Sequence, residues 1–124
     1  MTVTTLLIVD DDRSILTACR MVFMGEYTVI TAENGSDALK LLREDAPDVV
    51  ILDVGLQDMN GIDLLAQIKS LAPETVTIMM TATEETGMIN RARELGAVDY
   101  LVKPIDAKAL KTALQNALQK RGRN

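Results

Sequence analysis

The stretch Val49-Val50-Ile51-Leu52-Asp53 carries four consecutive aliphatic side chains and then a carboxylate. Because polar residues do not alternate with the apolar ones, this run suits a strand buried on both faces of a parallel sheet. Four further apolar runs lie along the chain, at residues 6–9, 27–31, 76–80 and 100–102. The run at 27–31 alternates more than the others, so we place it at an edge of the sheet.

Helical periodicity fills the segments between these runs. In the last segment, apolar side chains recur at the spacing of one helix face, at Leu110, Ala113, Leu114, Ala117 and Leu118. Three earlier faces combine Ala38 with Leu41 and Leu42, Leu64 with Leu65, Ile68 and Leu71, and Met88 with Ala92 and Leu95.

The residues between the elements agree with this division. Predicted helix ends fall at Gly25 and Gly96, predicted turns at Asn34-Gly35 and Asn60-Gly61, and a predicted helix cap at Asp106. A strand followed by a helix, five times over, predicts the α/β class: a (βα)5 doubly wound, five-stranded parallel sheet with right-handed crossovers. Such sheets bind ligands at the carboxyl ends of their strands.

The composition predicts a single domain spanning residues 1–124. With 48% hydrophobic but only 2% aromatic residues, its core must be aliphatic. A net charge of −5 argues against direct nucleic-acid binding, although the residues from Lys103 onward are mostly basic. The absence of histidine excludes His-based catalysis and His metal ligands. The single cysteine, Cys19, suits a buried structural thiol, and without a secretory signal or membrane span we expect a cytoplasmic protein with no membrane partner.

Polar side chains directly follow four of the five apolar runs: Asp10, Asp11 and Asp12 follow the first, Asp53 the third, Thr81 the fourth and Lys103 the fifth. Each has an ordinary structural explanation when taken singly. Acidic residues favour helix starts, which explains Asp12 best, and lysines are usually solvated.

Together, these residues predict a phosphoryl-transfer site. Asp10, Asp11 and Asp53 at one edge would repel one another unless a cation lay between them. Oxygen ligands without His or Cys favour Mg²⁺, for which Mn²⁺ can substitute. One carboxylate can then act as the nucleophile, while Thr81 binds one phosphoryl oxygen and Lys103 neutralises another.

The order and spacing of these motifs resemble the receiver domains of two-component response regulators over nearly the whole chain. Residues 6–12 (LLIVDDD) are similar to the opening strand and acidic pair of that family. Residues 49–53 resemble its phosphoacceptor strand, and Gly61 follows eight positions later, as expected. Residues 79–82 and 96–104 resemble its hydroxyl-bearing strand end and its last-strand signature. The resemblance implies a flavodoxin-like fold with strand order 2-1-3-4-5, as in chemotaxis regulators.

The resemblance also implies a role for each residue of the site. Asp53 would be the phosphoacceptor, and Thr81 and Lys103 would hold the phosphoryl oxygens. Mg²⁺ would be bound directly by Asp11, Asp53 and the Gly55 backbone carbonyl, and partly through water by Asp10. Thr81 and Tyr100 would form the switch, with the ring turning inward when Thr81 moves toward the phosphate. The Lys103-Pro104 peptide bond is expected to be cis.

We therefore expect a signalling switch that catalyses only its own phosphorylation and dephosphorylation. A sensor histidine kinase or a phosphotransfer protein would supply the phosphoryl group. The surface that changes would be the predicted fourth helix, fifth strand and fifth helix, around residues 88–95, 100–102 and 110–118. That surface would address an unknown effector or output domain, and a phosphorylation-dependent dimer through it is a further expectation.

Gln57 departs from the pattern of the family, in which proline usually stands four positions after the phosphoacceptor. Without the fixed φ of proline, the loop is expected to be less rigid, which affects the reach of the Gly55 carbonyl. Gly55 and Thr83 lie two positions after Asp53 and Thr81. Both are small, so we expect open access for an attacking water molecule.

Two other functions compete with this interpretation. Asp10-Asp11-Asp12 also fits the Asp-x-Asp start of haloacid-dehalogenase-type Mg²⁺-dependent phosphatases, in which Asp10 would be the nucleophile and Asp12 the acid/base. Such enzymes need a further acidic pair after the lysine, and here only Asp106 follows Lys103. A binding domain of the same fold that is never phosphorylated is disfavoured, because every residue of the acceptor site is present.

Overall fold

The computed structural model describes residues 4–82, 85–104 and 106–122. Strands and helices alternate along them: β1 (Thr5–Val9), α1 (Arg13–Phe23), β2 (Thr28–Ala32), α2 (Gly35–Asp45), β3 (Val49–Asp53), α3 (Gly61–Leu71), β4 (Val76–Thr81), α4 (Thr86–Glu94), β5 (Asp99–Val102) and α5 (Ala107–Gly122). The strands form one parallel sheet in the order β2-β1-β3-β4-β5. The predicted fold class and strand order are therefore confirmed.

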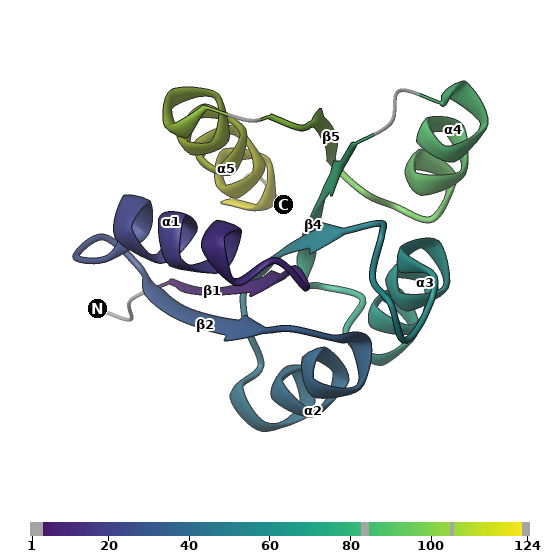
Figure 1. The fold of residues 1–124 in the computed structure, drawn as a ribbon, viewed down its shortest axis with the longest axis horizontal. Helices are drawn as coiled ribbons and strands as arrows, with labels where there is room; N and C mark the ends of the chain where they lie inside the picture. The colour runs from purple at the N-terminus through teal and green to yellow at the C-terminus, as the bar shows by residue number, and fades with distance from the viewer. Residues whose placement is uncertain (1–3, 83–84, 105, 123–124) are drawn as a thin grey trace.

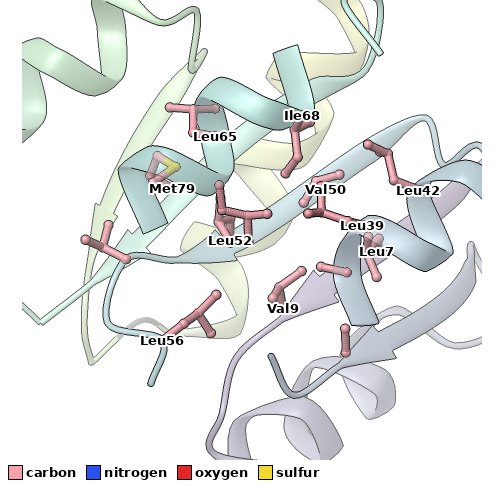
Figure 2. Packing of buried hydrophobic residues seen from close by; sticks show 14 of the residues in the cluster. Leu7, Val9, Leu39, Leu42, Val50, Leu52, Leu56, Leu65, Ile68 and Met79 are labelled. Atoms are coloured by element: carbon pink, nitrogen blue, oxygen red, sulfur yellow. The ribbon is translucent and has the colours of Figure 1, made fainter. Parts of the chain in front are cut away.

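Helices cover both faces of this sheet (Figure 1), with α1 and α5 on one face and α2, α3 and α4 on the other. Side chains alternate across the central strands and so enter two separate hydrophobic clusters. Leu7, Val50 and Leu52 join the cluster beneath α2–α4, which Figure 2 shows, whereas Ile8 and Ile51 join the cluster beneath α1 and α5. Every residue of β3 is buried, as its continuous apolar run predicts.

The end of β4 divides its side chains between the same two clusters. Met79 packs under α2–α4, and Met80 packs under α1 and α5. Both are almost completely buried, and Thr81 follows them directly at the edge of the sheet. Cys19 lies in the second cluster and is buried, in agreement with a structural thiol; burial raises its pKa, and the charge of Asp10 adds to this.

Two apolar faces differ from their prediction. In α2 the buried leucines are Leu39 and Leu42, and Leu41 is only half-buried. In α3, Leu71 is the last residue and is 51% exposed, because the next residue, Ala72, packs against the core in its place. The second strand begins one residue later than predicted, since the Tyr27 N–H donates to the Phe23 carbonyl at 3.1 Å and the Thr28 N–H is the first to donate across to the chain beside β1. The ring of Tyr27 also packs edge-to-face against Phe23 at a centroid distance of 5.6 Å.

The two predicted Asn-Gly turns are helix starts instead. The side chain of Asn34 accepts a hydrogen bond from the Asp37 N–H at 2.8 Å, and that of Asn60 accepts one from the Ile62 N–H at 2.7 Å. Both asparagines therefore cap α2 and α3. The predicted cap at Asp106 is confirmed, because its carboxylate accepts from the Ala109 N–H at 2.7 Å. Gly25 and Gly96 have positive φ just beyond α1 and α4, as predicted for helix ends.

In the described part of the chain, no helix combines the length and the apolar character needed to cross a membrane. The cytoplasmic location stays a prediction.

Gly61 tests how closely α3 approaches the sheet. A Cβ at this position would lie 2.4 Å from the Cα of Val54, a backbone atom that cannot move aside. We expect Gly61→Ala to lower the free energy of unfolding by about 2 kcal/mol through overpacking. Gly87→Ala in α4 is the control, because the nearest neighbour of the added Cβ would be a flexible side-chain oxygen of Glu85 3.9 Å away. We expect this second change to raise the free energy of unfolding by about 0.5 kcal/mol. Equal effects in urea denaturation would contradict this account.

Candidate functional site

The carboxyl ends of β1 and β3 bring the predicted acidic residues together. The two strands are neighbours, and Val9 is paired with Leu52, so the residues that follow them, Asp10 and Asp53, lie side by side. Asp11 completes the group: one carboxylate oxygen from each of the three residues lies within 4.8 Å of the others. The structure thus assembles all three carboxylates that the sequence singles out.

Lys103 reaches this group from the far side of β4. Its Nζ lies 2.8 Å from Oδ2 of Asp10 and 3.3 Å from Oδ2 of Asp53. Its backbone N–H donates to the carbonyl of Thr81 at 2.6 Å, which ties the end of β5 to the end of β4. The Lys103-Pro104 peptide bond is cis, as the resemblance implies.

Burial and charge act in opposite directions on these groups. Asp10 is fully buried, which raises its pKa, while the hydrogen bond from Lys103 partly lowers it again. For Lys103, burial lowers the pKa, but the hydrogen bonds and charges of Asp10 and Asp53 outweigh this and leave the pKa raised. The lysine is therefore held in its charged form. One ammonium facing three carboxylates leaves two negative charges uncompensated.

Backbone N–H groups orient the same carboxylates. The Asp12 N–H donates to Oδ1 of Asp10 at 2.9 Å, and the Gly55 N–H donates to Oδ1 of Asp53 at 3.1 Å. Asp12 has a different role: its carboxylate accepts a hydrogen bond from the Ser14 N–H at 2.9 Å and caps α1, as predicted. The local chain thus fixes both buried carboxylates before any ligand is present.

This donor set fits a divalent cation of the Mg²⁺ type. The three side chains offer only carboxylate oxygens, the chain has no histidine, and Cys19 belongs to the core instead of the site. Hard cations prefer such oxygen ligands, and Mg²⁺ usually uses one or two carboxylates together with water and phosphate oxygens. The two uncompensated charges match the charge of one such ion.

Thr81 and Tyr100 lie on the strands next to the acidic group. Thr81 ends β4, is almost completely buried and is paired with Val102 of β5. Tyr100 lies on β5, is half-buried and packs against the cluster beneath α2–α4. Tyr100 is therefore on the strand that ends just before Lys103, and Thr81 is on the neighbouring strand.

The loop after β3 contains both Gly55 and Gln57. Gly55 is exposed, and a Cβ there would lie 3.8 Å from Oδ1 of Asp53, so a side chain at this position would border the Asp53 carboxylate. Gln57 is also exposed. Thr83, the second small residue of the prediction, lies outside the described residues.

Asp58 is a residue of this loop that the sequence interpretation missed. Its two carboxylate oxygens accept hydrogen bonds from the Gly35 N–H at 2.9 Å and the Ser36 N–H at 3.1 Å. An acid in a loop and a helix start more than twenty positions away carry no shared sequence signal. Only their placement at the same edge of the sheet relates them.

Comparisons with known proteins agree with this geometry. A family model described as "Response regulator receiver domain" matches residues 6–115. The chain is 39% identical over 114 residues to the transcriptional regulatory protein ZraR of Escherichia coli K12, covering 91% of this chain and 26% of that protein. It is 36% identical over 118 residues to the transcriptional regulatory protein KdpE of Mycobacterium tuberculosis H37Rv, covering 94% of this chain and 52% of that protein.

A solved structure shares the whole fold. The receiver domain protein (CheY-like) of Methanospirillum hungatei JF-1 superposes with a TM-score of 0.93 at 27% identity, covering 98% of each chain. The present chain thus spans about a quarter of the length of ZraR and about half that of KdpE, but nearly all of this structure.

Removal of the lysine tests the electrostatics of the site. We expect Lys103→Met to destabilise the metal-free protein by about 3 kcal/mol at neutral pH, because buried Asp10 then loses its charged partner. The folded pKa of Asp10 already lies above its ordinary value of 3.8, and the substitution should raise it further. A carboxyl group whose pKa is higher in the folded than in the unfolded state destabilises the fold at pH values above the folded pKa. This destabilisation disappears as the pH falls toward the pKa of the unfolded state.

The difference in the free energy of unfolding between the wild type and the variant should therefore become smaller as the pH is lowered from about 7.5 to about 5. Urea denaturation in the presence of EDTA at both pH values measures the effect. An unchanged difference between the two proteins across this range would contradict the assignment.

Proposed function

Because the chain belongs to the family of response regulator receiver domains, we propose that Asp53 is the residue that accepts the phosphoryl group. A receiver domain is a phosphorylation-dependent switch and a signalling domain, not a conventional enzyme. We propose that the domain extends over residues 1–124, since α5 continues to Gly122, beyond the matched residues. The phosphatase alternative, with Asp10 as nucleophile, receives no support from the comparisons.

The arrangement of Lys103 between two carboxylates is the observation that carries this proposal. The ammonium lies within 3.3 Å of both Asp10 and Asp53, so it can neutralise a group that binds to either. Exposure favours Asp53 as the nucleophile, because its side chain is 8% exposed whereas that of Asp10 is 0% exposed. Asp10 is thus better suited to hold charge than to meet an incoming donor.

The chemistry follows from these positions. A carboxylate oxygen of Asp53 forms a bond to phosphorus while the bond between phosphorus and the donor breaks. Lys103 then binds a phosphoryl oxygen, and the hydroxyl of Thr81 donates a hydrogen bond to another. Held by Asp10, Asp11, Asp53 and the Gly55 carbonyl, Mg²⁺ or Mn²⁺ would neutralise negative charge on the phosphoryl group. In this way the domain would promote both its own phosphorylation and its own dephosphorylation.

The donor is proposed to be a sensor histidine kinase or a phosphotransfer protein. This chain has no histidine, so a phosphohistidine must come from another protein. A cavity of about 510 Å³ between α1 and the start of α5 lies beside Lys103 and is lined mainly by apolar side chains, including Ile15, Val22 and Pro104. An apolar surface next to the acceptor is a suitable contact for the donor protein.

The response is proposed to pass through Thr81 and Tyr100. Movement of the Thr81 hydroxyl toward the phosphoryl group would leave space into which the Tyr100 ring turns. Tyr100 lies on β5 and, like Met88 and Leu95 at α4, packs against the cluster beneath α2–α4, so this movement would alter the α4-β5-α5 surface. That surface would address an effector or output domain, or a second phosphorylated copy.

We expect the protein to acquire one phosphoryl group when incubated with Mg²⁺ and acetyl phosphate or phosphoramidate, as measured by intact mass. Asp53→Asn should abolish the adduct, and EDTA should suppress it in the wild type. Loss of the adduct in Asp10→Asn together with full labelling of Asp53→Asn would favour the phosphatase. Absence of any adduct would instead support a binding domain that is never phosphorylated.

The small residue at position 55 leads to a prediction about the lifetime of the adduct. Since a Cβ there would lie 3.8 Å from Oδ1 of Asp53, a large side chain should obstruct the attacking water. We expect Gly55→Leu to lengthen the lifetime of the phosphoryl group several-fold, measured by its decay after removal of the donor. A lifetime of many hours in the wild type would contradict open access.

A further inference from the structure

The loop between Asp53 and α3 is attached to the first turn of α2. The first N–H groups of a helix have no partner within the helix and need acceptors from elsewhere. In α2, Asn34 supplies an acceptor to the Asp37 N–H through its side chain. The Gly35 and Ser36 N–H groups instead donate to the two oxygens of Asp58, at 2.9 and 3.1 Å. Asp58 therefore completes the cap of a helix to which it does not belong.

The next residue in the loop strengthens this attachment. The thioether of Met59 packs directly over Gly35: a Cβ added to Gly35 would lie 2.5 Å from the Met59 sulfur. Met59 is half-buried and also contacts the cluster beneath α2–α4. Glycine at position 35 thus lets the loop approach the helix, and two consecutive loop residues contact the same turn.

The helix that receives the loop is itself firmly placed. Ala38, Leu39 and Leu42 of α2 are buried against the sheet. A contact to its first turn is therefore a contact to the rigid scaffold. Negative charge at a helix start is also favourable, and the Gly35 hydrogen bond contributes most to lowering the pKa of Asp58 below its usual value.

The other fixed points of the loop lie on either side of Asp58. At its start, the Val54 N–H donates to the Met80 carbonyl at 3.0 Å, and at its end the Gly61 N–H donates to the Val54 carbonyl at 3.0 Å. Between these points lie Gly55, which contacts the acceptor carboxylate, and exposed Gln57, which lacks the φ restriction of proline. Buried Leu56 enters the cluster beneath α2–α4 and holds the middle of this interval. The hold on position 58 restrains the exposed part of the loop that follows Leu56, and so adds to the placement of the peptide units before it.

We propose that Asp58 is a positioning residue of the phosphorylation site: through its two bonds to α2, and together with buried Leu56, it fixes the loop from which the Gly55 carbonyl would bind Mg²⁺. It takes over the stiffening that proline at position 57 would provide. This inference rests on the proposed function of Asp53, because only then does the place of the Gly55 carbonyl affect Mg²⁺ binding and phosphoryl transfer.

The test compares Asp58→Ala and Asp58→Asn with Asp37→Ala. Asp37 is the matched control, since it is an exposed carboxylate in the same helical turn whose side chain accepts from Asn34 instead of the loop. Calorimetric titration with Mg²⁺ should give a dissociation constant about tenfold higher in Asp58→Ala, in the range found for residues that orient metal ligands from outside. Asp58→Asn should lie between this value and the wild type, and Asp37→Ala should match the wild type.

Two further measurements separate positioning from general stability. In the metal-free protein, amide hydrogen exchange at residues 55–58 should be faster in Asp58→Ala but not in Asp37→Ala. With acetyl phosphate, Asp53 should be phosphorylated more slowly in Asp58→Ala than in the wild type at low Mg²⁺. The rate should return to that of the wild type when Mg²⁺ is saturating.

An unchanged Mg²⁺ dissociation constant in Asp58→Ala, with normal labelling of wild-type Asp53, would overturn the role of Asp58 alone. Failure of the wild type to be labelled at Asp53 would overturn the proposed function instead. Equal losses in Asp58→Ala and Asp37→Ala would also overturn the inference, because charge at the helix start would then explain both.

Discussion

Burial of like charges at one edge of the sheet is the constraint around which the rest of the molecule is arranged. Asp10 and Asp53 are both buried, and their mutual repulsion is reduced by an ammonium that arrives from 93 positions away along the chain. This compensation requires β1 next to β3, and it requires β5 to end where Lys103 can reach past β4. Strand order is therefore an electrostatic requirement as well as a packing result. The cluster holds more negative charge than its one ammonium balances, and this excess favours the binding of a cation there.

Much of this could be predicted from the sequence, because the relevant signals are local. The run 49–53 indicates a buried strand by itself, and the acidic, hydroxyl and amine residues stand directly after their strands. Since parallel strands end at the same edge, adjacency in space follows from position along each strand. The cap at Asp106 is likewise predictable, because the acceptor and the N–H that it satisfies are three positions apart.

The features that could not be predicted depend on contacts between distant segments. Asn34-Gly35 has the composition of a turn, and only the packing of Met59 explains why glycine stands at the start of a helix there. Leu39 is buried and Leu71 exposed because of where each helix meets the sheet, which periodicity alone does not specify. The bonds of Asp58 belong to the same class, since two loops must first be brought side by side by the order of β2, β1 and β3.

The two methionines before Thr81 have a consequence for how the sheet tolerates movement. The other central strands present branched side chains to both clusters, whereas β4 ends with unbranched Met79 on one side and Met80 on the other. A thioether chain changes its torsion angles at little cost and refills the space that it leaves. The end of this strand is thus packed between two adaptable side chains, whereas most of the rest of the core consists of stiffer branched aliphatic side chains. A small displacement of the terminal hydroxyl can be absorbed on both faces at once, without opening a void in either.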